Sequence, residues 1–405
     1  MDALTAEQTR LIETVRALGR ERFAPRAHRY DLEASFPFEN YADLRAAGLL
    51  GLTIPARHGG LGADYATYAL VSAELGRWCG ATALTFNMHA CTMLWSSQMA
   101  DDLPMPDAER ALHERRRGAL YARVIRDGAV FAQPFSEPNS AAAAGQAPFG
   151  TTARKVDGGW RVNGVKHFAS LSGAAQYYGL LCTEERAGAA PSVRDTLYLA
   201  VPADAPGAEV FGPWDPLGMR GTVSRSLRFT DVFVGDDDML MPRGLYHQAA
   251  LRWPHMFMTL CPTYLGIARA AFDFTVAYLR GEVSGAPTPG LRASATKQLA
   301  VAEMRVKLEQ AEALFHRAIG EARVDPPKEA RLRAYATQYT VMEHANDLCR
   351  LAIRTCGGRS MMRALPLERL YRDSRCGSLM LPWTAEICLE RMGRESLFEQ
   401  GEPQG

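Results

Sequence analysis

Histidine and cysteine are the residue types in this sequence whose chemistry can be judged most directly from spacing. The nine histidines lack the His-Glu-x-x-His pattern of a zinc site, and none of the eight cysteines sits in Cys-x-x-Cys spacing. We therefore predict no metal centre and interpret the cysteines as reduced core residues. His255 is a chemically sensible base near neutral pH. Its neighbours equally suit a buried core histidine; they are Trp253, Pro254, Met256 and Phe257.

Two short runs have the composition of phosphate-binding segments, but neither carries the rest of that pattern. No strand precedes Gly59-Gly60-Leu61-Gly62, so turn chemistry explains this run adequately. The run Arg115-Arg116-Arg117 has no stacking aromatic residues around it and suits a solvated helix end. With 46 basic and 45 acidic residues the formal net charge is +1, which gives no electrostatic case for a nucleic-acid partner.

The stretch from Trp78 to Ala100 contains no Asp, Glu, Lys or Arg and is long enough to cross a bilayer. It also contains many polar side chains, among them Asn87 and His89, which would be costly in lipid. We predict a helix buried inside the protein, with these two residues as candidates to line a polar pocket, and no membrane association. The first residues show no basic region followed by an apolar core, so we predict no secretory signal and a cytoplasmic location.

The spacing of apolar residues divides the chain into three predicted domains. Residues 1–127 show helical spacing, for example at Leu11, Val15 and Leu18. Residues 128–240 change to short alternating runs, and Asp157-Gly158 between two of them is a strong hairpin signal. Residues 241–405 return to long helical stretches. This order of helical domain, β-domain and second helical domain predicts an α+β fold.

Individual elements can be placed within these domains. Further strands are expected at 178–182, 196–201 and 226–233. The C-terminal domain is expected to contain long helices at 294–323 and 327–356, with a loop from Gly281 to Gly290 before them.

Five short sequence motifs, in the order in which they occur along the chain, resemble motifs of the acyl-CoA dehydrogenase family of flavoproteins. They are Gly48–Gly62, Ser136-Glu137-Pro138, Asn163–Ser170, Leu217–Thr222, and Gly357-Gly358 followed by Pro366–Asp373. The resemblance covers nearly the whole chain. It implies an acyl-CoA dehydrogenase-like fold with an N-terminal helical domain, a middle antiparallel β-domain and a C-terminal four-helix bundle. It also implies FAD between the β-domain and the C-terminal helices, in a homodimer or homotetramer whose neighbouring subunit completes the site.

The resemblance assigns cofactor roles to residues of the β-domain. Ser136 and Ser170 stand where the family places Thr or Ser hydroxyls against the isoalloxazine ring, whose N5 edge needs hydroxyl or backbone donors. Phe168 stands where the family commonly has Trp, a conservative change for a stacking wall. Gln133 and Phe135 would flank the ring.

Further cofactor contacts are implied near the C-terminus. Thr384 with Glu386 matches the family's Thr-x-Gln/Glu contact, and Gly357 and Gly358 would let backbone approach the pyrophosphate of the neighbouring subunit's FAD. The family's Arg-x-x-Phe-Gly cofactor loop survives only as Arg280 to Ser284, with Val in place of the aromatic residue. The loop from Asn139 to Gly145 is longer than the family's glycine-rich loop and lacks its Ser-Asp pair.

The position of the family's catalytic glutamate holds no acid in this sequence. Depending on the register of the Thr384 segment, that glutamate falls on Pro382 or Leu381, and the glycine after it falls on Trp383 in the first register. A subgroup of the family keeps its base earlier, at a position that matches Met256 here. Loss of a positioned base costs roughly 10²- to 10⁴-fold in rate. Ordinary dehydrogenation through the usual base is therefore not expected.

Other residues could replace the missing base or shape the cavity. His255 is the candidate catalytic residue, while Glu386 is the nearest carboxylate but has an implied cofactor role. Trp383 would narrow a cavity beside the flavin if its side chain points inward, which would favour a small or flat substrate.

Three functions remain open at this point. The first is a flavin oxidoreductase acting on a CoA- or carrier-bound acyl group, with a relocated base or with chemistry that needs none, such as desulfination. The second is a flavin-dependent monooxygenase on the same fold. The third is a non-catalytic subunit that completes the FAD site of an active homologue in a hetero-oligomer. The implied electron acceptor is a flavoprotein or oxygen.

Overall fold

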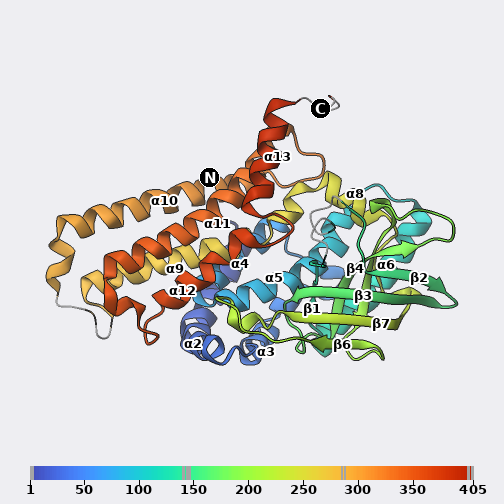
Figure 1. Ribbon diagram of the computed structural model, residues 1–405, viewed down its shortest axis with the longest axis horizontal. Coiled ribbons are helices and arrows are strands. Elements are labelled where there is room, and N and C mark those ends of the chain that lie inside the picture. Colours follow the sequence, from blue (N-terminus) through green and yellow to red (C-terminus); the bar gives the residue numbers. More distant parts are fainter. Residues whose placement is uncertain are drawn as a thin grey trace.

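Helices at both ends of the chain flank a sheet formed by its middle part (Figure 1). The computed structural model describes residues 4–138, 142, 147–283, 286, 289–398 and 402. Before the sheet lie α1 Ala6–Leu18, α2 Ala24–Glu33, α3 Phe38–Ala46, α4 Tyr65–Trp78, α5 Gly80–Leu94 and α6 Asp107–Ala122. After it lie α8 Leu245–Arg252, α9 Cys261–Arg280, α10 Ala295–Gly320, α11 Lys328–Cys356, α12 Leu367–Arg375 and α13 Ala385–Leu397. The predicted succession of helices, strands and helices is confirmed.

The first helices begin and end where the sequence supplies caps. The Thr5 side chain accepts a hydrogen bond from the backbone N–H of Gln8 (3.1 Å), and the Gln8 side chain accepts one from Thr5 N (3.1 Å), so two of the backbone N–H groups at the start of α1 are satisfied. Leu11 and Val15 are buried, as the helical spacing predicts. Gly48 follows α3 with a φ of +72°, a left-handed conformation that glycine adopts readily at helix ends.

The uncharged stretch from Trp78 to Ala100 is a buried helical segment, as predicted, whereas the lining of a polar pocket by Asn87 and His89 stays a prediction. It contains all of α5 and continues as a π-helical turn, Trp95–Met99. Its polar side chains have partners inside the protein: Asn87 Nδ2 donates to the carbonyl of Thr259 (2.8 Å), and His89 Nε2 lies 2.8 Å from the carbonyl of Leu50. Within the described residues, no helix is long and apolar enough to cross a membrane.

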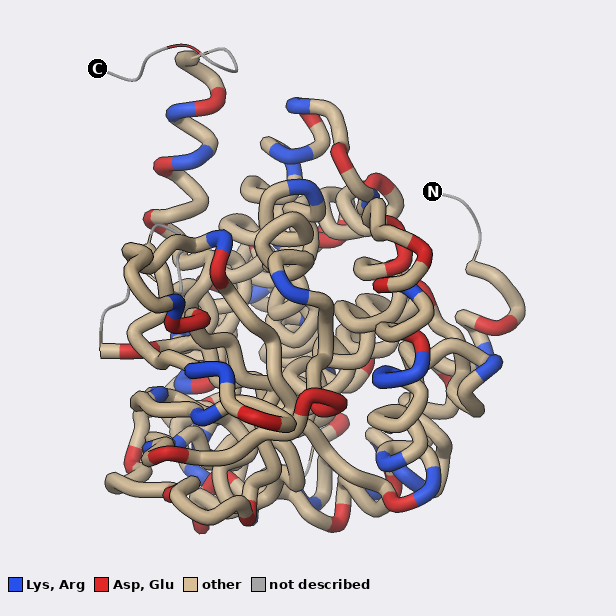
Figure 2. Tube along the Cα trace, turned by 90° about the vertical axis from the view of Figure 1, so that its right-hand side faces the viewer, with Lys and Arg blue, Asp and Glu red and all other residues tan. Residues whose placement is uncertain are grey.

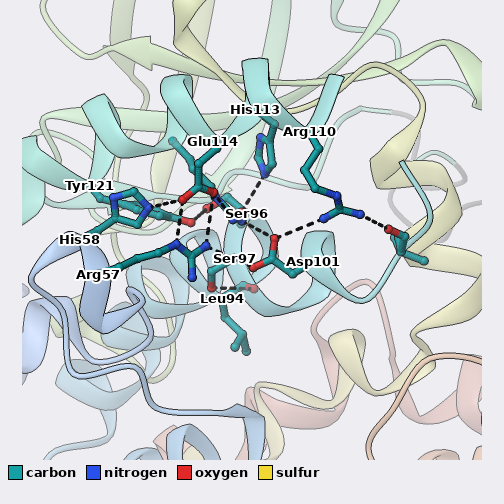
Figure 3. A network of polar contacts seen from close by, with 12 residues as sticks. Arg57, His58, Leu94, Ser96, Ser97, Asp101, Arg110, His113, Glu114 and Tyr121 are labelled. Atoms are coloured by element: carbon teal, nitrogen blue, oxygen red, sulfur yellow. Dashed lines mark hydrogen bonds and ion pairs between the residues drawn. The ribbon is translucent and has the colours of Figure 1, made fainter. Parts of the chain in front are cut away.

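A network of polar contacts joins the segment before α4 and the turn after α5 to α6 (Figure 3). Glu114 accepts a hydrogen bond from Arg57 Nε (2.8 Å) and lies 2.8 Å from His58 Nε2. It also accepts one from Arg117 Nε (2.7 Å), and Arg57 and Arg117 together lower the pKa of Glu114 although burial opposes them. Arg117 is buried and pairs with Asp101 (2.8 Å) as well. Because each charge touches an opposite charge, we interpret this network as structural.

The middle of the chain forms one sheet in the order β6-β7-β3-β2-β4-β5-β8, with β1 beside β4. The strands are β1 Phe131–Ala132, β2 Thr152–Val156, β3 Gly159–Ala169, β4 Tyr177–Glu185, β5 Thr196–Pro202, β6 Ala208–Phe211, β7 Arg225–Gly235 and β8 Met239–Met241. The predicted hairpin is confirmed, because β2 and β3 pair antiparallel across Asp157-Gly158. The three further predicted strands lie within β4, β5 and β7.

The sheet is mixed, which corrects the prediction of an antiparallel β-domain. Of the described pairings, five are antiparallel, whereas β1 and β2 both run parallel to β4. The cause is the order of the strands. After the β2–β3 hairpin the chain crosses back and places β4 on the far side of β2, so β4 runs in the same direction as β2. Turn residues and alternation indicate hairpins but do not indicate such a crossover.

Long helices form the C-terminal part, as expected. The stretches predicted at 294–323 and 327–356 are α10 and α11, which pack against each other and against α9, while α12 packs on α9 and α11 (Figure 1). In the predicted loop between Gly281 and Gly290, residues 284, 285, 287 and 288 lie outside the described residues. α13 projects from the bundle towards the C-terminus (Figures 1 and 2). Acidic and basic residues are interleaved on the side that Figure 2 presents.

Candidate functional site

Two loops at one end of β3 and β7 concentrate backbone strain. Of the seven non-glycine residues with positive φ in the described chain, four lie here: Phe168 (+50°), Leu171 (+68°), Met219 (+54°) and Val223 (+46°). A positive φ is a genuine outlier for a β-branched residue such as Val223. Strain of this kind costs of order 1–3 kcal/mol for each residue and clusters at functional sites. These loops, 168–172 and 219–224, are therefore our candidate functional site.

Hydrogen bonds hold the two strained loops together. Leu171 N donates to the carbonyl of Thr222 (3.0 Å), and Ser172 N donates to the carbonyl of Val223 (3.1 Å). A chain of buried hydroxyls runs between the loops as well. Ser170 Oγ lies 2.8 Å from Ser224 Oγ, which lies 2.7 Å from Thr222 Oγ1. Each loop thus keeps the other in its strained conformation.

The irregular end of β3 presents an aromatic side chain to the outside. Phe168 is 72% exposed, although large apolar side chains are usually covered. Its neighbour His167 donates its backbone N–H to the carbonyl of Ser136 (2.8 Å), so the Ser136 segment lies beside this end of β3. The structure therefore brings the predicted residues Ser136, Phe168 and Ser170 into one region, as the sequence analysis expected of a flavin edge.

The two residues expected to flank the ring contact different parts of the interior, Gln133 the strand β5 and Phe135 the turn after α5. Gln133 Nε2 donates to Tyr198 Oη (2.8 Å) and is buried. The Phe135 ring packs edge-on against Trp95 with centroids 5.6 Å apart, and Phe135 is partly buried. The predicted loop 139–145 lies outside the described residues, apart from Ala142.

A buried ion pair fixes the backbone on which Ser136 and Phe168 stand. Lys166 Nζ lies 2.6 Å from Glu137 Oε1, and the two side chains are 0% and 2% exposed. Glu137 also accepts hydrogen bonds from the backbone N–H groups of Gly150 (2.6 Å) and Thr151 (3.0 Å). Burial alone would raise the pKa of Glu137, but the charge of Lys166 and these donors outweigh it and lower the pKa.

The second strained loop is anchored from the C-terminal part of the chain. Asp373 on α12 accepts a hydrogen bond from the backbone N–H of Met219 (2.5 Å), and Arg372 Nη1 donates to the carbonyl of Leu217 (3.1 Å). Arg372 also pairs with Asp31 on α2 (2.6 Å). Burial raises the pKa of Asp373 to about 6, although Arg369 and the Met219 N–H oppose the shift.

Replacing Asp373 with Asn should remove a pH-dependent loss of stability. The pKa of Asp373 is raised from 3.8 to about 6 on folding. The contribution of Asp373 to the free energy of unfolding therefore falls as pH rises from about 4 to about 7. At 1.36 kcal/mol per pKa unit, the loss is about 3 kcal/mol. Asp373→Asn keeps an oxygen acceptor for Met219 N. In urea unfolding, the variant should therefore gain stability relative to the parent between pH 4.5 and pH 7.5. A difference that is constant with pH would refute this account.

An aromatic cavity of about 290 Å³ lies between the sheet and the C-terminal helices. Phe149, Tyr246, Phe257 and Tyr335 supply its aromatic walls. The titratable side chains that line it, apart from the tyrosines, are His247, Arg331, Arg391, Arg394 and Glu395. Phe149 also links the cavity to the strained loops, because its ring centroid lies 4.3 Å from Lys166 Nζ, two residues before Phe168.

The segment from Leu381 to Trp383, where the family's catalytic glutamate would fall, is apolar and packs behind the wall of this cavity. Trp383 is 1% exposed, and its ring packs against Tyr335 (4.7 Å between centroids) and Phe257 (5.9 Å). Pro382 is buried and Leu381 partly buried. Trp383 is not one of the residues that line the cavity; it packs behind two that do. The expectation that it narrows the space therefore holds only indirectly, through the aromatic walls that it supports.

The next residues begin α13. Thr384 caps the helix, accepting a hydrogen bond from Ile387 N (3.3 Å), which explains why the chain turns into a helix here. Glu386 is exposed in the first helical turn. Among the described residues that line the cavity, Glu395 is the one carboxylate, and it is paired with Arg331 (3.2 Å).

His255 is not among the residues that line the cavity, although Pro254 and Phe257 of the same turn are. It is fully buried in the 3₁₀ turn Pro254–Met258, its ring packs near Tyr65, and neither ring nitrogen has a hydrogen-bond partner. Burial lowers the pKa of His255 to about 4. Its role as a base stays a prediction.

The remaining predicted residues lie at the ends of C-terminal helices. Arg280 is exposed at the end of α9, and Val283 is partly buried against the core. Gly357 follows α11 with a φ of +85°, and a methyl group added at Gly357 or Gly358 would meet nothing within 4 Å. Both glycines thus leave open space through which another molecule can approach the backbone.

Sequence reasoning missed several residues that build this region. Thr222 lies in a motif quoted above, and Ser224 follows two positions later. The contact of Ser224 with Ser170 joins the ends of two neighbouring strands that are far apart in sequence. Lys166 and Asp373 also lie in quoted phrases. Buried charges are almost always paired, so an acid in one phrase and a lysine in another could have suggested the Glu137–Lys166 contact.

Comparison with known proteins matches this architecture. Three domain models match: acyl-CoA dehydrogenase N-terminal domain over residues 5–99, middle domain over 132–232 and C-terminal domain over 258–379. The human short-chain specific acyl-CoA dehydrogenase is 27% identical over 367 residues, 90% of this chain and 84% of the relative. The L-evernosamine nitrososynthase of a Micromonospora species is 28% identical over 387 residues, 91% of this chain and 85% of the relative.

A solved structure with this fold is the dibenzothiophene monooxygenase TdsC of Paenibacillus sp. A11-2. It superimposes with a TM-score of 0.78 at 21% identity, covering 96% of this chain and 97% of that one. TdsC has also been solved bound to FMN.

Proposed function

The chain belongs to the acyl-CoA dehydrogenase family, and from that premise we propose a flavin enzyme that works without the family's carboxylate base. Its chemistry is the reaction of reduced flavin with oxygen, as in a monooxygenase. The observation that carries this proposal is the apolar segment from Leu381 to Trp383, where the family's glutamate would stand. Glu395 is the one carboxylate among the described residues that line the cavity, and it is paired with Arg331.

The strained loops fit a flavin by the chemistry of their side chains. Phe168 is an exposed aromatic ring that a planar ligand would cover, and Ser170, two residues later, carries a hydroxyl. Gly357 and Gly358 leave room for a phosphate-bearing group from a neighbouring subunit, in the homo-oligomer that the resemblance implies. FAD is the cofactor implied by the resemblance. FMN is the alternative, supported by Val283, which stands where an aromatic residue of the adenine side is expected.

A bound flavin would supply two-electron redox chemistry and, when reduced, reactivity towards oxygen. This chain's own residues would hold and shield it. Phe168 would stack on the ring and Ser170 would hold its polar edge, while Glu137 with Lys166 keeps the supporting strands in place. The aromatic walls of the cavity orient the substrate and exclude water, which strengthens every polar contact inside.

The cavity also indicates the substrate class. Arg331, Arg391 and Arg394 line it together with aromatic side chains, a combination that suits a substrate attached to a phosphate-bearing carrier. An acyl-CoA thioester is the candidate suggested by the named dehydrogenase relative. A reaction on such a thioester that needs no α-proton abstraction is therefore the second candidate function.

The oxygen reaction can be tested on the purified chain. We would load it with FMN or with FAD, remove free flavin by gel filtration, reduce the bound flavin without air, and mix it with air-saturated buffer. We expect the bound flavin to reoxidise within seconds, read as the return of its visible absorbance. Bound flavin that stays reduced in air for many minutes would contradict the proposal and favour an electron-transferring dehydrogenase.

A further inference from the structure

The hydroxyl chain between the strained loops has a direction that follows from counting hydrogens. Each hydroxyl carries one hydrogen and can accept through its lone pairs. Thr222 Oγ1 donates to the carbonyl of Met219 (2.8 Å). The 2.7 Å contact between Thr222 and Ser224 must then be donated by Ser224, and the 2.8 Å contact between Ser224 and Ser170 must be donated by Ser170. Ser170 Oγ is left at the end of the chain as an acceptor only.

The opposite direction is possible at the cost of one hydrogen bond. If Thr222 donates to Ser224 and Ser224 to Ser170, the Ser170 hydroxyl becomes a donor. The carbonyl of Met219 then loses the Thr222 hydroxyl and keeps only the backbone N–H of Thr222 (3.0 Å). The strained conformations of Met219 and Val223, with the Asp373 anchor on Met219 N, fix the loop and so keep the oxygens in line.

We propose that Ser224 and Thr222 are positioning residues that bias Ser170 towards accepting a hydrogen bond and thereby favour the reduced state of a flavin held at Ser170. This inference rests on the proposed function. The N5 atom of an oxidised isoalloxazine is an acceptor, whereas in the two-electron reduced ring N5 carries a hydrogen. When Ser170 is an acceptor, it can accept a hydrogen bond from N5–H of the reduced ring. When the direction of the hydroxyl chain is reversed, Ser170 can donate to the unprotonated N5 of the oxidised ring. One neutral hydrogen bond corresponds to about a fivefold bias towards the reduced state.

Removing the middle hydroxyl should reverse the bias. In Ser224→Ala the Ser170 hydrogen has lost its acceptor, so Ser170 donates to the bare nitrogen at no cost, while accepting from the N–H leaves its own hydrogen without a partner. We expect the ratio of reduced to oxidised bound flavin to fall about fivefold if the bias is only lost and about 25-fold if it is fully reversed, at a fixed potential. For a two-electron couple this lowers the midpoint potential by about 20–40 mV.

Matched variants distinguish an effect of the hydrogen-bonded hydroxyls from a general disturbance of the loop in which they lie. Thr222→Val removes the hydroxyl that fixes the direction and should also lower the potential, while Thr222→Ser keeps the hydroxyl and should restore it. Ser172→Ala is the control, because Ser172 is buried in the same loop but donates to the carbonyl of Ala169, outside the chain. The midpoint potential would be measured by reduction alongside a reference dye, with flavin affinity and thermal unfolding recorded for each variant.

Different results would contradict the proposed function and the proposed role of Ser224 and Thr222. A parent protein that binds neither FMN nor FAD would overturn the proposed function, and this inference with it. A flavin-bound Ser224→Ala whose potential equals that of Ser172→Ala would overturn the inference alone. If Ser224→Ala does not fold, Thr222→Val decides on the same criterion.

Discussion

Replacing Lys166 with methionine is expected to lower the free energy of unfolding by about 3–5 kcal/mol, because it leaves the Glu137 carboxylate buried without its countercharge. The ammonium group of Lys166 is fully buried, so water cannot take its place. The two backbone N–H groups that donate to Glu137 would remain, but they carry only partial charge. This is the largest stability effect that we expect of a single substitution in the β-domain.

The measurement is chemical denaturation of Lys166→Met beside a matched lysine on the same sheet. Lys155 lies 2.7 Å from Asp236, but this pair is exposed, so Lys155→Met should cost less than about 1 kcal/mol. Adding Glu137→Gln to Lys166→Met should recover part of the loss, because the buried charge is then gone. Equal losses for the two lysine variants would show that the buried pair does not hold the sheet together.

Replacing Phe168 with alanine is expected to weaken flavin binding by roughly five- to 150-fold, or about 1–3 kcal/mol, the range measured for stacking of planar rings on aromatic side chains. Phe168 is 72% exposed in a strained conformation, so the free protein gains little from it. Folding stability should therefore change by less than the binding free energy. A ligand that covers the ring would account for both its exposure and the strain.

Fluorescence titration with FMN and with FAD measures this effect. Phe233→Ala is the control, because Phe233 is another exposed aromatic residue of the sheet (44%), on β7 and outside the strained loops. Its loss should leave the dissociation constant unchanged. Unchanged affinity in Phe168→Ala would place the flavin elsewhere. The titration also decides between FMN and FAD.

Much of the fold could be predicted because its signals are local. Asp157-Gly158 lies between two alternating runs, and this suffices for the hairpin of β2 and β3. The long helix α11 follows from uninterrupted helical spacing. The parallel neighbour of β2 could not be predicted in this way, because it depends on which side of the hairpin the chain returns to.

The candidate site could be predicted only in part, for a similar reason. Ser136 and Ser170 were identified by resemblance, and the structure brings their segments together through the contact of His167 with Ser136. The left-handed conformation of Val223 has no local cause, since a β-branched residue avoids it. It is imposed by hydrogen bonds from residues more than 50 positions away in sequence, as for Ser172 N with the Val223 carbonyl.

The central claim is that this flavin site lacks a base able to remove an α-proton from an acyl thioester. The most direct measurement is to load the protein with flavin, exclude oxygen, add butyryl-CoA in excess and record the visible spectrum. The account predicts that the absorbance of the oxidised flavin persists, because the segment from Leu381 to Trp383 offers no carboxylate. Rapid bleaching on addition of butyryl-CoA would reveal a working base and contradict the account.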